Sequence, residues 1–171
     1  MTDKLPSSSA ASTASDIYLH VKTKRAGKIK GEVVAADHVD DILVKSWNWG
    51  MSQGSAMGSG QATARRAYKH LTIDKYIDSA STALMNALAT NDEVKEARLA
   101  MRKAGEGQED FFSILLGGAR VVAIDIEVDE HGTPVEHVSF AFTQVEVEFR
   151  TQGTGGQAGA ASTFMDEFLP Q

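Results

Sequence analysis

One acidic turn and five histidines carry the residue types most often used for metal binding or acid–base chemistry. In the turn, Asp37-His38-Val39-Asp40-Asp41, three carboxylates flank an imidazole, and both groups are ligands for divalent metals. No further ligands pair with this turn at metal-binding spacing, and no two histidines form a metal-binding motif. We therefore expect a polar surface turn that binds no metal. The histidines are His20, His38, His70, His131 and His137.

Familiar catalytic signatures are missing from the sequence. There is no nucleophile elbow, and no Gly-x-Gly-x-x-Gly follows a predicted strand. Carboxylates are numerous, but they are scattered over faces that we expect to point outward. A catalytic set that only the fold assembles stays open, because such sets are spatial rather than sequential. We expect a protein that is not an enzyme and has no cofactor.

A basic cluster near the N-terminus could contact phosphate, but a solvated hairpin tip is the preferred interpretation. The chain has 17 Lys and Arg against 23 Asp and Glu, which gives a formal net charge of −6. This balance argues against nucleic acid as the main partner. The cluster consists of Lys22, Lys24, Arg25, Lys28 and Lys30.

Trp47, Trp49 and Met51 alternate along one predicted strand and point the same way. Core packing is the first interpretation, a subunit contact the second, and stacking on a sugar or base the third. A Gly/Ser-rich loop follows at 54–64. It is longer than a hairpin needs and lacks the lysine of a P-loop, so we expect it to be mobile in the isolated subunit and to contact another subunit. The proposed ring or stacking contacts are Trp47, Trp49, Met51, Gly54, Met57, Gly58 and Gly60.

The elements that position these residues are mostly strands. Gly117-Gly118 predicts a bend in one long strand, and a change of alternation near Thr143-Gln144 predicts a bulge or a strand that changes sheets. Alternation at 93–103 and a following turn favour a strand there over a helix. Along 110–128 the even-numbered apolar residues share one face. The predicted strands are 16–22, 29–36, 42–53, 65–76, 93–103, 110–128 and 136–150.

Only one segment has helical spacing. Leu84 and Leu88 lie four residues apart, Ser81 or Asp78 is the expected N-cap, and Asn91 stands where a left-handed residue ends a helix. A helix of about ten residues does not survive alone in water, so it must pack on a large apolar surface. We therefore predict a mainly β protein, with a closed or nearly closed β-barrel of two packed sheets and one short lateral α-helix.

Composition suggests three regions. Residues 1–15 are a Ser/Ala-rich tail that we expect to be disordered, 16–152 form the β-barrel domain, and 153–171 form a Gly/Ala-rich tail. The last tail ends in an apolar helical turn that docks on its own body or on a partner. The chain has no cysteine, no run long enough to insert in a membrane, and no apolar signal-peptide core, so we expect folding in the cytoplasm and export without a cleaved signal.

Several blocks in one order resemble the Hcp family, the tube-forming proteins of the bacterial type VI secretion system. The resemblance covers about residues 16–152. Where the family often has proline after the helix-capping serine, this chain has Thr82, and proline there is helpful but not required. The blocks are Gly31-Glu32, His38, the segment 46–53, the strand-to-helix junction 71–81, Arg102-Lys103-Ala104-Gly105 and the segment 138–149.

This resemblance implies a hexameric ring of β-barrels. The rings would stack into a tube inside a contractile sheath, carry a VgrG-type spike, be secreted, and hold effector proteins in the lumen. The partners are then other copies of the chain, the spike, the sheath and effectors, with no nucleic acid and no membrane insertion. Three alternatives remain: a tube subunit of a phage-tail-like contractile particle, a monomeric β-barrel binding module that presents Trp47 and Trp49, and a hydrolase built from scattered carboxylates.

Overall fold

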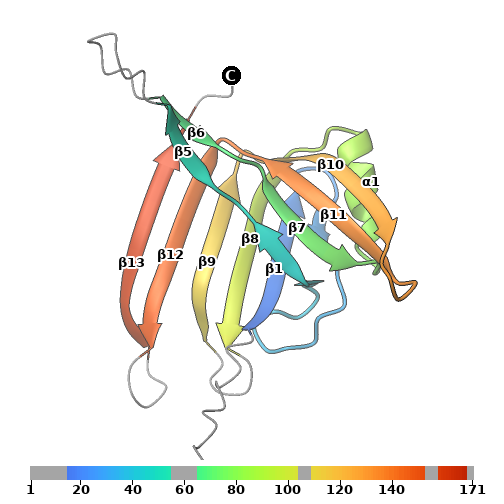
Figure 1. The fold of residues 1–171 in the computed structure, drawn as a ribbon, viewed down its shortest axis with the longest axis horizontal. Helices are drawn as coiled ribbons and strands as arrows, with labels where there is room; N and C mark the ends of the chain where they lie inside the picture. The colour runs from blue at the N-terminus through green and yellow to red at the C-terminus, as the bar shows by residue number, and fades with distance from the viewer. Residues whose placement is uncertain (1–14, 55–64, 104–108, 153–157, 169–171) are drawn as a thin grey trace, which may run out of the picture.

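Two packed β-sheets and one helix enclose the apolar core (Figure 1). The computed structural model describes residues 15–54, 65–103, 109–152 and 158–168. As predicted, the protein is mainly β. The elements are β1 (Ser15–Thr23), β2 (Gly27–Ile29), β3 (Ile42–Val44), β4 (Ser46–Asn48), β5 (Met51–Gly54), β6 (Arg65–Tyr68), β7 (Leu71–Tyr76), α1 (Ser81–Ala89), β8 (Val94–Lys103), β9 (Asp110–Gly117), β10 (Arg120–Val128), β11 (Pro134–Ala141), β12 (Gln144–Gln152) and β13 (Ala158–Glu167).

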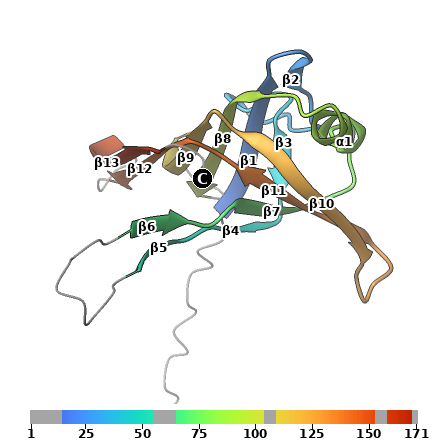
Figure 2. The ribbon, with the colours of Figure 1, turned by 90° about the horizontal axis from the view of Figure 1, so that it is seen from above.

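The strands form three antiparallel sheets. The largest has seven strands in the order β13-β12-β9-β8-β1-β2, with β3 also paired to β1. A four-stranded sheet, β10-β11-β7-β4, packs against it, and β5 and β6 form a two-stranded ribbon (Figure 2). The hydrogen-bonded ladders of the described residues end at free edges, so they show two packed sheets rather than a closed barrel.

The chain passes directly between the two large sheets at three points, and a fourth time through α1, between β7 and β8. β3 pairs with β1 and β4 pairs with β7, and at the crossing the Lys45 amide donates to the Asp74 carbonyl at 2.8 Å. The bend predicted at Gly117-Gly118 separates β9 from β10, and Gly118 has a φ of +54°. The change of alternation predicted near Thr143-Gln144 separates β11 from β12, which belong to different sheets.

The crossing at Lys45 corrects the prediction of one long strand at 42–53. Three short strands occupy this segment, and the face that points inward changes where the chain leaves one sheet for the other. Ile42 and Val44 are buried while Leu43 is exposed, but beyond the crossing Trp47 packs on the core. A continuous alternation therefore could not describe the segment.

The helix is present, but its predicted cap is wrong. Ala80 is the N-cap residue and makes no side-chain capping bond. Ser81 is the first helical residue, and its hydroxyl donates to Glu136 at 2.7 Å. Asn91 has the expected positive φ of 51°, and Leu84 is fully buried. In the described ranges no helix has both the length and the apolar content that a bilayer crossing requires.

The predicted strand at 29–36 ends almost at once, because β2 covers only Gly27–Ile29. The chain then folds back on itself: the Gly31 amide donates to the Asp40 carbonyl at 2.8 Å, and the Asp40 amide to the Val33 carbonyl at 2.9 Å. A Cβ on Gly31 would lie 2.3 Å from the Asp41 carbonyl oxygen. Only glycine allows this close return.

The predicted linker and apolar helical turn near the C-terminus are also wrong for the described residues. Ala158–Glu167 form β13, which pairs along β12 and makes the edge of the largest sheet (Figure 1). Small residues such as Gly159 and Ala160 favoured a linker, but the neighbouring strand supplies hydrogen-bond partners that composition does not reveal.

The strand at 93–103 is confirmed as β8, against the helical propensity of its residues. The prediction that the even-numbered apolar residues share one face is only partly right for 120–128. Val121 is buried and Val122 is exposed, and a register shift lies between Val121 and Ala123. Ile126 and Val128 share the parity of Ile124, which packs on the core, but they extend beyond the helix and are exposed.

Candidate assembly surfaces

Of the residues predicted to make ring contacts, the two tryptophans pack within their own subunit. Trp47 stacks on Phe112 with ring centroids 5.8 Å apart, and Trp49 stacks on Tyr68 at 6.0 Å. Both indoles are half-buried against the core. Met51 and Gly54 lie exposed on β5. Met57, Gly58 and Gly60 fall outside the described residues.

An aromatic cluster fastens the β5–β6 ribbon to the C-terminal end of the chain. The Tyr68 ring stacks on Phe168 at 4.6 Å, and Phe142 meets both rings edge-on. The Tyr68 hydroxyl and the Arg66 guanidinium both donate to the Asp166 carboxylate. These two hydrogen bonds, that of Tyr68 first, hold the pKa of Asp166 below its usual value. The base of the ribbon is therefore positioned by β13, a strand that composition did not predict.

The core-facing side of the seven-stranded sheet continues beyond the core. Cross-strand pairing places Leu99, Ile114, Val147 and Phe164 in one row across β8, β9, β12 and β13. Leu99 and Ile114 are fully buried, but Phe164 is 40% exposed and Phe149 on β12 is 45% exposed. An apolar sheet face thus extends past the part that this subunit covers, and it ends at the free edge of β13.

A second exposed apolar surface lies at the other side of the molecule. Ile126 and Val128 are 51% and 64% exposed near the β10–β11 turn, which projects beyond the body (Figure 2). The two surfaces are formed by different residues on different sheets. Large exposed apolar surfaces of this kind mark contacts with other proteins.

Two residues of the predicted polar surface turn, His38 and Asp41, are in fact buried, while Asp37, Val39 and Asp40 are exposed as expected. His38 is stacked on Tyr18 at 4.4 Å, its Nδ1 lies 2.9 Å from an Asp41 oxygen, and its Nε2 lies 2.9 Å from an Asp110 oxygen. Arg102 donates to Asp110 at 3.3 Å. This network pins the 30–41 loop onto the face of the large sheet that points away from the core. The one sequence signal for it was the apolar ring of Tyr18 on a face predicted to meet water.

The environment of Asp41 shows how this network is balanced. Burial alone would raise the pKa of Asp41, but hydrogen bonds from His38, Lys28 and His20 outweigh it and hold that pKa below its usual value. The carboxylate is therefore charged near neutral pH, and its oxygens are occupied by these neighbours. Among the described residues, no group of three or more His, Asp or Glu side chains has metal-binding geometry.

Lys75, Ser81 and Glu136 form a polar cluster beneath the helix. The Lys75 ammonium lies 2.5 Å from Glu136 and 3.1 Å from the Ser81 hydroxyl, and Lys75 and Glu136 are both 0% exposed. A serine, a lysine and a carboxylate can serve as nucleophile and base in hydrolases. Here all three are sealed under α1 and reach no solvent, so the arrangement can hold the helix to the sheet but cannot meet a substrate.

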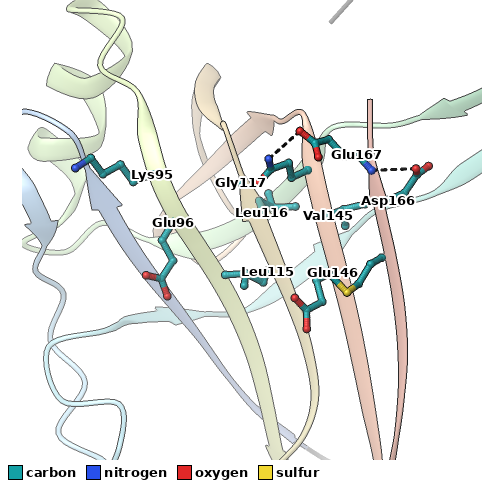
Figure 3. A pocket seen from close by; sticks show the side chains of 11 residues that line it. Lys95, Glu96, Leu115, Leu116, Gly117, Val145, Glu146, Asp166 and Glu167 are labelled. Carbon is teal, nitrogen blue, oxygen red and sulfur yellow. Dashed lines mark hydrogen bonds between the residues drawn. The ribbon is translucent and has the colours of Figure 1, made fainter. Parts of the chain in front are cut away.

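A cavity of about 580 Å³ opens on the face of the large sheet opposite the core (Figure 3). Gly117 leaves part of its floor without a side chain, and Leu115 and Met165 line it with apolar atoms. Glu96, Glu146 and Glu167 carry carboxylates around it, while Lys95 projects away from them (Figure 3). The Gln144 amide donates to Glu167 at 3.1 Å.

Comparison with known proteins gives a consistent result. A family described as "Type VI secretion system effector, Hcp" matches residues 18–149. Protein hcp1 of Pseudomonas aeruginosa is 32% identical over 138 residues, which cover 77% of this chain and 84% of that protein. The major exported protein of the same organism is 25% identical over 135 residues, covering 74% and 78%.

A solved structure shows that this likeness extends to the fold. The crystal structure of Hcp1 from Salmonella typhimurium matches with a TM-score of 0.74 and 27% identity, over 91% of this chain and 95% of that one. The matched family region spans most of the chain and includes all the strands from β2 to β11. This chain therefore belongs to the Hcp family of type VI secretion proteins.

Proposed function

We propose that this chain is a structural subunit that assembles into hexameric rings, and that these rings stack as the inner tube of a type VI secretion system. In this role the tube is expelled with a spike from a contractile sheath, leaves the cell, and carries effector proteins in its lumen. Membership of the family supports the proposal, and so does the name of one relative, the major exported protein.

The observation that carries the proposal is the apolar sheet face that runs past the core onto Phe149 and Phe164. A monomer that exposes such a face beside a free strand edge is prone to aggregation. A second copy would cover both. In this contact the other exposed apolar surface, at Ile126 and Val128 of one copy, meets the apolar sheet face of the next copy. The two sides of the contact differ, so the contact is heterologous. Repeating a heterologous contact closes a ring when the rotation between neighbours fits.

We further infer that the two large sheets act as one barrel wall. The chain crosses between them at Lys45, at Gly117-Gly118 and at Phe142-Thr143. Val94 and Ala119 form a bridge across the second crossing, with both backbone bonds made. A wall tied at these crossings resists the shear that contraction of a sheath would apply.

Two alternatives have less support. A monomeric module that presents Trp47 and Trp49 to a ligand needs free indole faces, but both indoles pack on neighbouring rings of this subunit. A tube subunit of a phage-tail-like particle would have the same kind of assembly, but the family match is to a type VI secretion protein.

The test is the mass and shape of the purified protein. Native mass spectrometry at micromolar concentration should give six copies, and negative-stain images should show rings. The double variant Phe149→Asp/Phe164→Asp should remain a folded monomer, while Val34→Asp, at a side chain that is 90% exposed elsewhere on the surface, should still form rings. A wild-type protein that stays monomeric under all conditions would refute the proposal.

A further inference from the structure

The face of the large sheet that points away from the core has an uneven distribution of charge. At the β2 edge, Lys22, Lys24 and Arg25 are exposed around the β1–β2 hairpin. In the described part of the chain, Lys28 is the member of this basic cluster that forms an ion pair, with Asp41 at 3.1 Å. The Asp92 carboxylate accepts a hydrogen bond from the Arg25 amide at 3.2 Å, but among the described residues the side chains of Lys22, Lys24 and Arg25 form no ion pair.

The opposite edge of the same sheet is acidic. Glu146 on β12 and Glu167 on β13 lie on this face beside the cavity, and Met165 stands between them at 69% exposure. Asp166, the next residue, belongs to the other face, where it pairs with Arg66. Glu146 and Glu167 thus lie on the β12–β13 side of the sheet and the basic hairpin on the β1–β2 side, with Glu96 of β8, the cross-strand neighbour of Lys22, between them.

Register places both groups at the same end of the strands. Thr23, beside the hairpin tip, pairs with Val94, and Val94 bridges to Ala119. Gly117, two residues before Ala119, pairs with Gln144, and Gln144 pairs with Glu167. If two copies stand side by side in the same orientation, the hairpin tip of one faces the acidic edge of the other at the same height.

We propose that the basic β1–β2 hairpin of one copy docks on the acidic β12–β13 edge of the next, with the cavity beside Gly117 receiving its side chains. This inference rests on the proposed self-assembly and adds to it the surface that sets direction. Leu115 and Met165 offer apolar contact to the stems of Lys24 and Arg25, while Glu146 and Glu167 face their charges. The occupant is a second copy because the complementary charge lies on the other edge of the same sheet.

Such a contact sets specificity and rate more than total affinity. Complementary charges at the rim of an interface steer association, and like charges suppress the wrong pairing. Two copies that meet through equivalent edges would place Glu167 against Glu167, or Lys24 against Lys24. The charge pattern therefore favours head-to-tail rings over symmetric dimers, and its contribution falls as salt is raised.

Two charge-reversed proteins test this pairing. Lys24→Glu/Arg25→Glu and Glu146→Lys/Glu167→Lys should each shift the concentration for half-assembly upward on the order of tenfold at low salt. High salt should relieve part of the loss. Glu32→Lys, a matched charge change at an exposed residue of the 30–41 loop, should assemble like wild type. Circular dichroism melts establish that each variant is folded.

Mixing the two reversed proteins is the decisive experiment. In an alternating ring each reversed edge meets an edge reversed in the opposite sense, and the remaining contacts are wild-type, so a one-to-one mixture should assemble where neither protein does alone. Analytical ultracentrifugation measures the size of the assemblies in the mixture and in each separate protein directly. Failure of the mixture, or unchanged assembly of the separate variants, overturns the pairing while wild-type rings still support the proposed function. A monomeric wild type would overturn both.

Discussion

The buried pair Lys75–Glu136 gives the sharpest prediction for stability. Both side chains are 0% exposed, and their charged atoms lie 2.5 Å apart. Breaking a buried pair by removing one partner costs about 3–5 kcal/mol, because the remaining charge is left without compensation. A change of each kcal/mol shifts the melting temperature of a chain of this size by about 2–4 °C, so a single variant should melt roughly 6–20 °C lower.

The contacts of each partner predict which variant loses more. In Glu136→Leu, the Lys75 ammonium keeps its contacts with Asp78 at 2.8 Å and with the Tyr76 carbonyl at 2.9 Å. The loss of stability should therefore lie near the lower limit of that range of about 3–5 kcal/mol. In Lys75→Met, Glu136 keeps the Ser81 hydroxyl as its one partner among the described residues, and within that part of the chain its Oε1 atom has no partner even in the wild type. Lys75→Met should therefore lose more stability than Glu136→Leu.

The double variant completes the test. Lys75→Met/Glu136→Leu removes both charges and fills the space with apolar atoms, so it should be more stable than either single variant. Thermal unfolding followed by circular dichroism, with all proteins in the same assembly state, measures each value. Lys95→Met, at an exposed lysine, is the control and should change stability by less than about 0.5 kcal/mol. Additive losses in the double variant would refute the reasoning.

Three further predictions concern the loop, the ribbon and a surface histidine. A charge at Met57 should shorten tubes in electron micrographs while rings persist, and tubes of unchanged length would contradict the expected stacking contact. Because the pKa of Asp166 is lowered in the folded state, the hydrogen bonds that it accepts from the β5–β6 ribbon should be present above about pH 4 and be lost as pH falls through the folded-state pKa. In a Trp47→Phe background, Trp49 fluorescence should change over that pH range. Asp166→Asn should show the changed fluorescence already at neutral pH. The His137 imidazole donates hydrogen bonds to the carboxylates of Asp74 and Glu127, which raise the pKa of His137. Its stabilising effect should therefore be complete below about pH 6.5 and vanish as pH rises through the folded-state pKa. His137→Gln should lose more stability at pH 6 than at pH 9, and equal losses would contradict this.

The local sequence pattern was sufficient to predict which face is buried where a strand stays in one sheet. The alternation of Ile17, Leu19 and Val21 predicted which side of β1 is buried, and Val138 and Phe140 did so for β11. The glycines at 117–118 marked the place where β9 ends because Gly118 has a φ of +54°, which other residues rarely adopt, and a Cβ there would lie 2.2 Å from the Thr143 hydroxyl unless that side chain moved. In these segments one face meets the core throughout, so the two-residue period identifies the face that meets the core.

Local pattern failed where distant segments decide the environment. His38 and Asp41 had the composition of a surface turn, but the 30–41 loop lies down on β1 and β9 and buries them between Tyr18 and Asp110. Ala158–Glu167 had the composition of a linker, but β12 offers a ladder of hydrogen-bond partners. The assembly surfaces depend on this second error, because β13 carries Phe164 and Glu167.

The amino-acid sequence by itself determined the family, the mainly β class, the single helix and the positions of the main bends, because alternation and glycine are properties of neighbouring residues. Only the tertiary structure decided which strands change sheets, where the apolar face outruns the core, and that opposite charges gather at the two edges of one sheet. These features depend on register between segments up to about a hundred residues apart, as in the contact of Arg66 with Asp166. Pairing over such distances is set by the packing of the whole chain, and no local pattern encodes it.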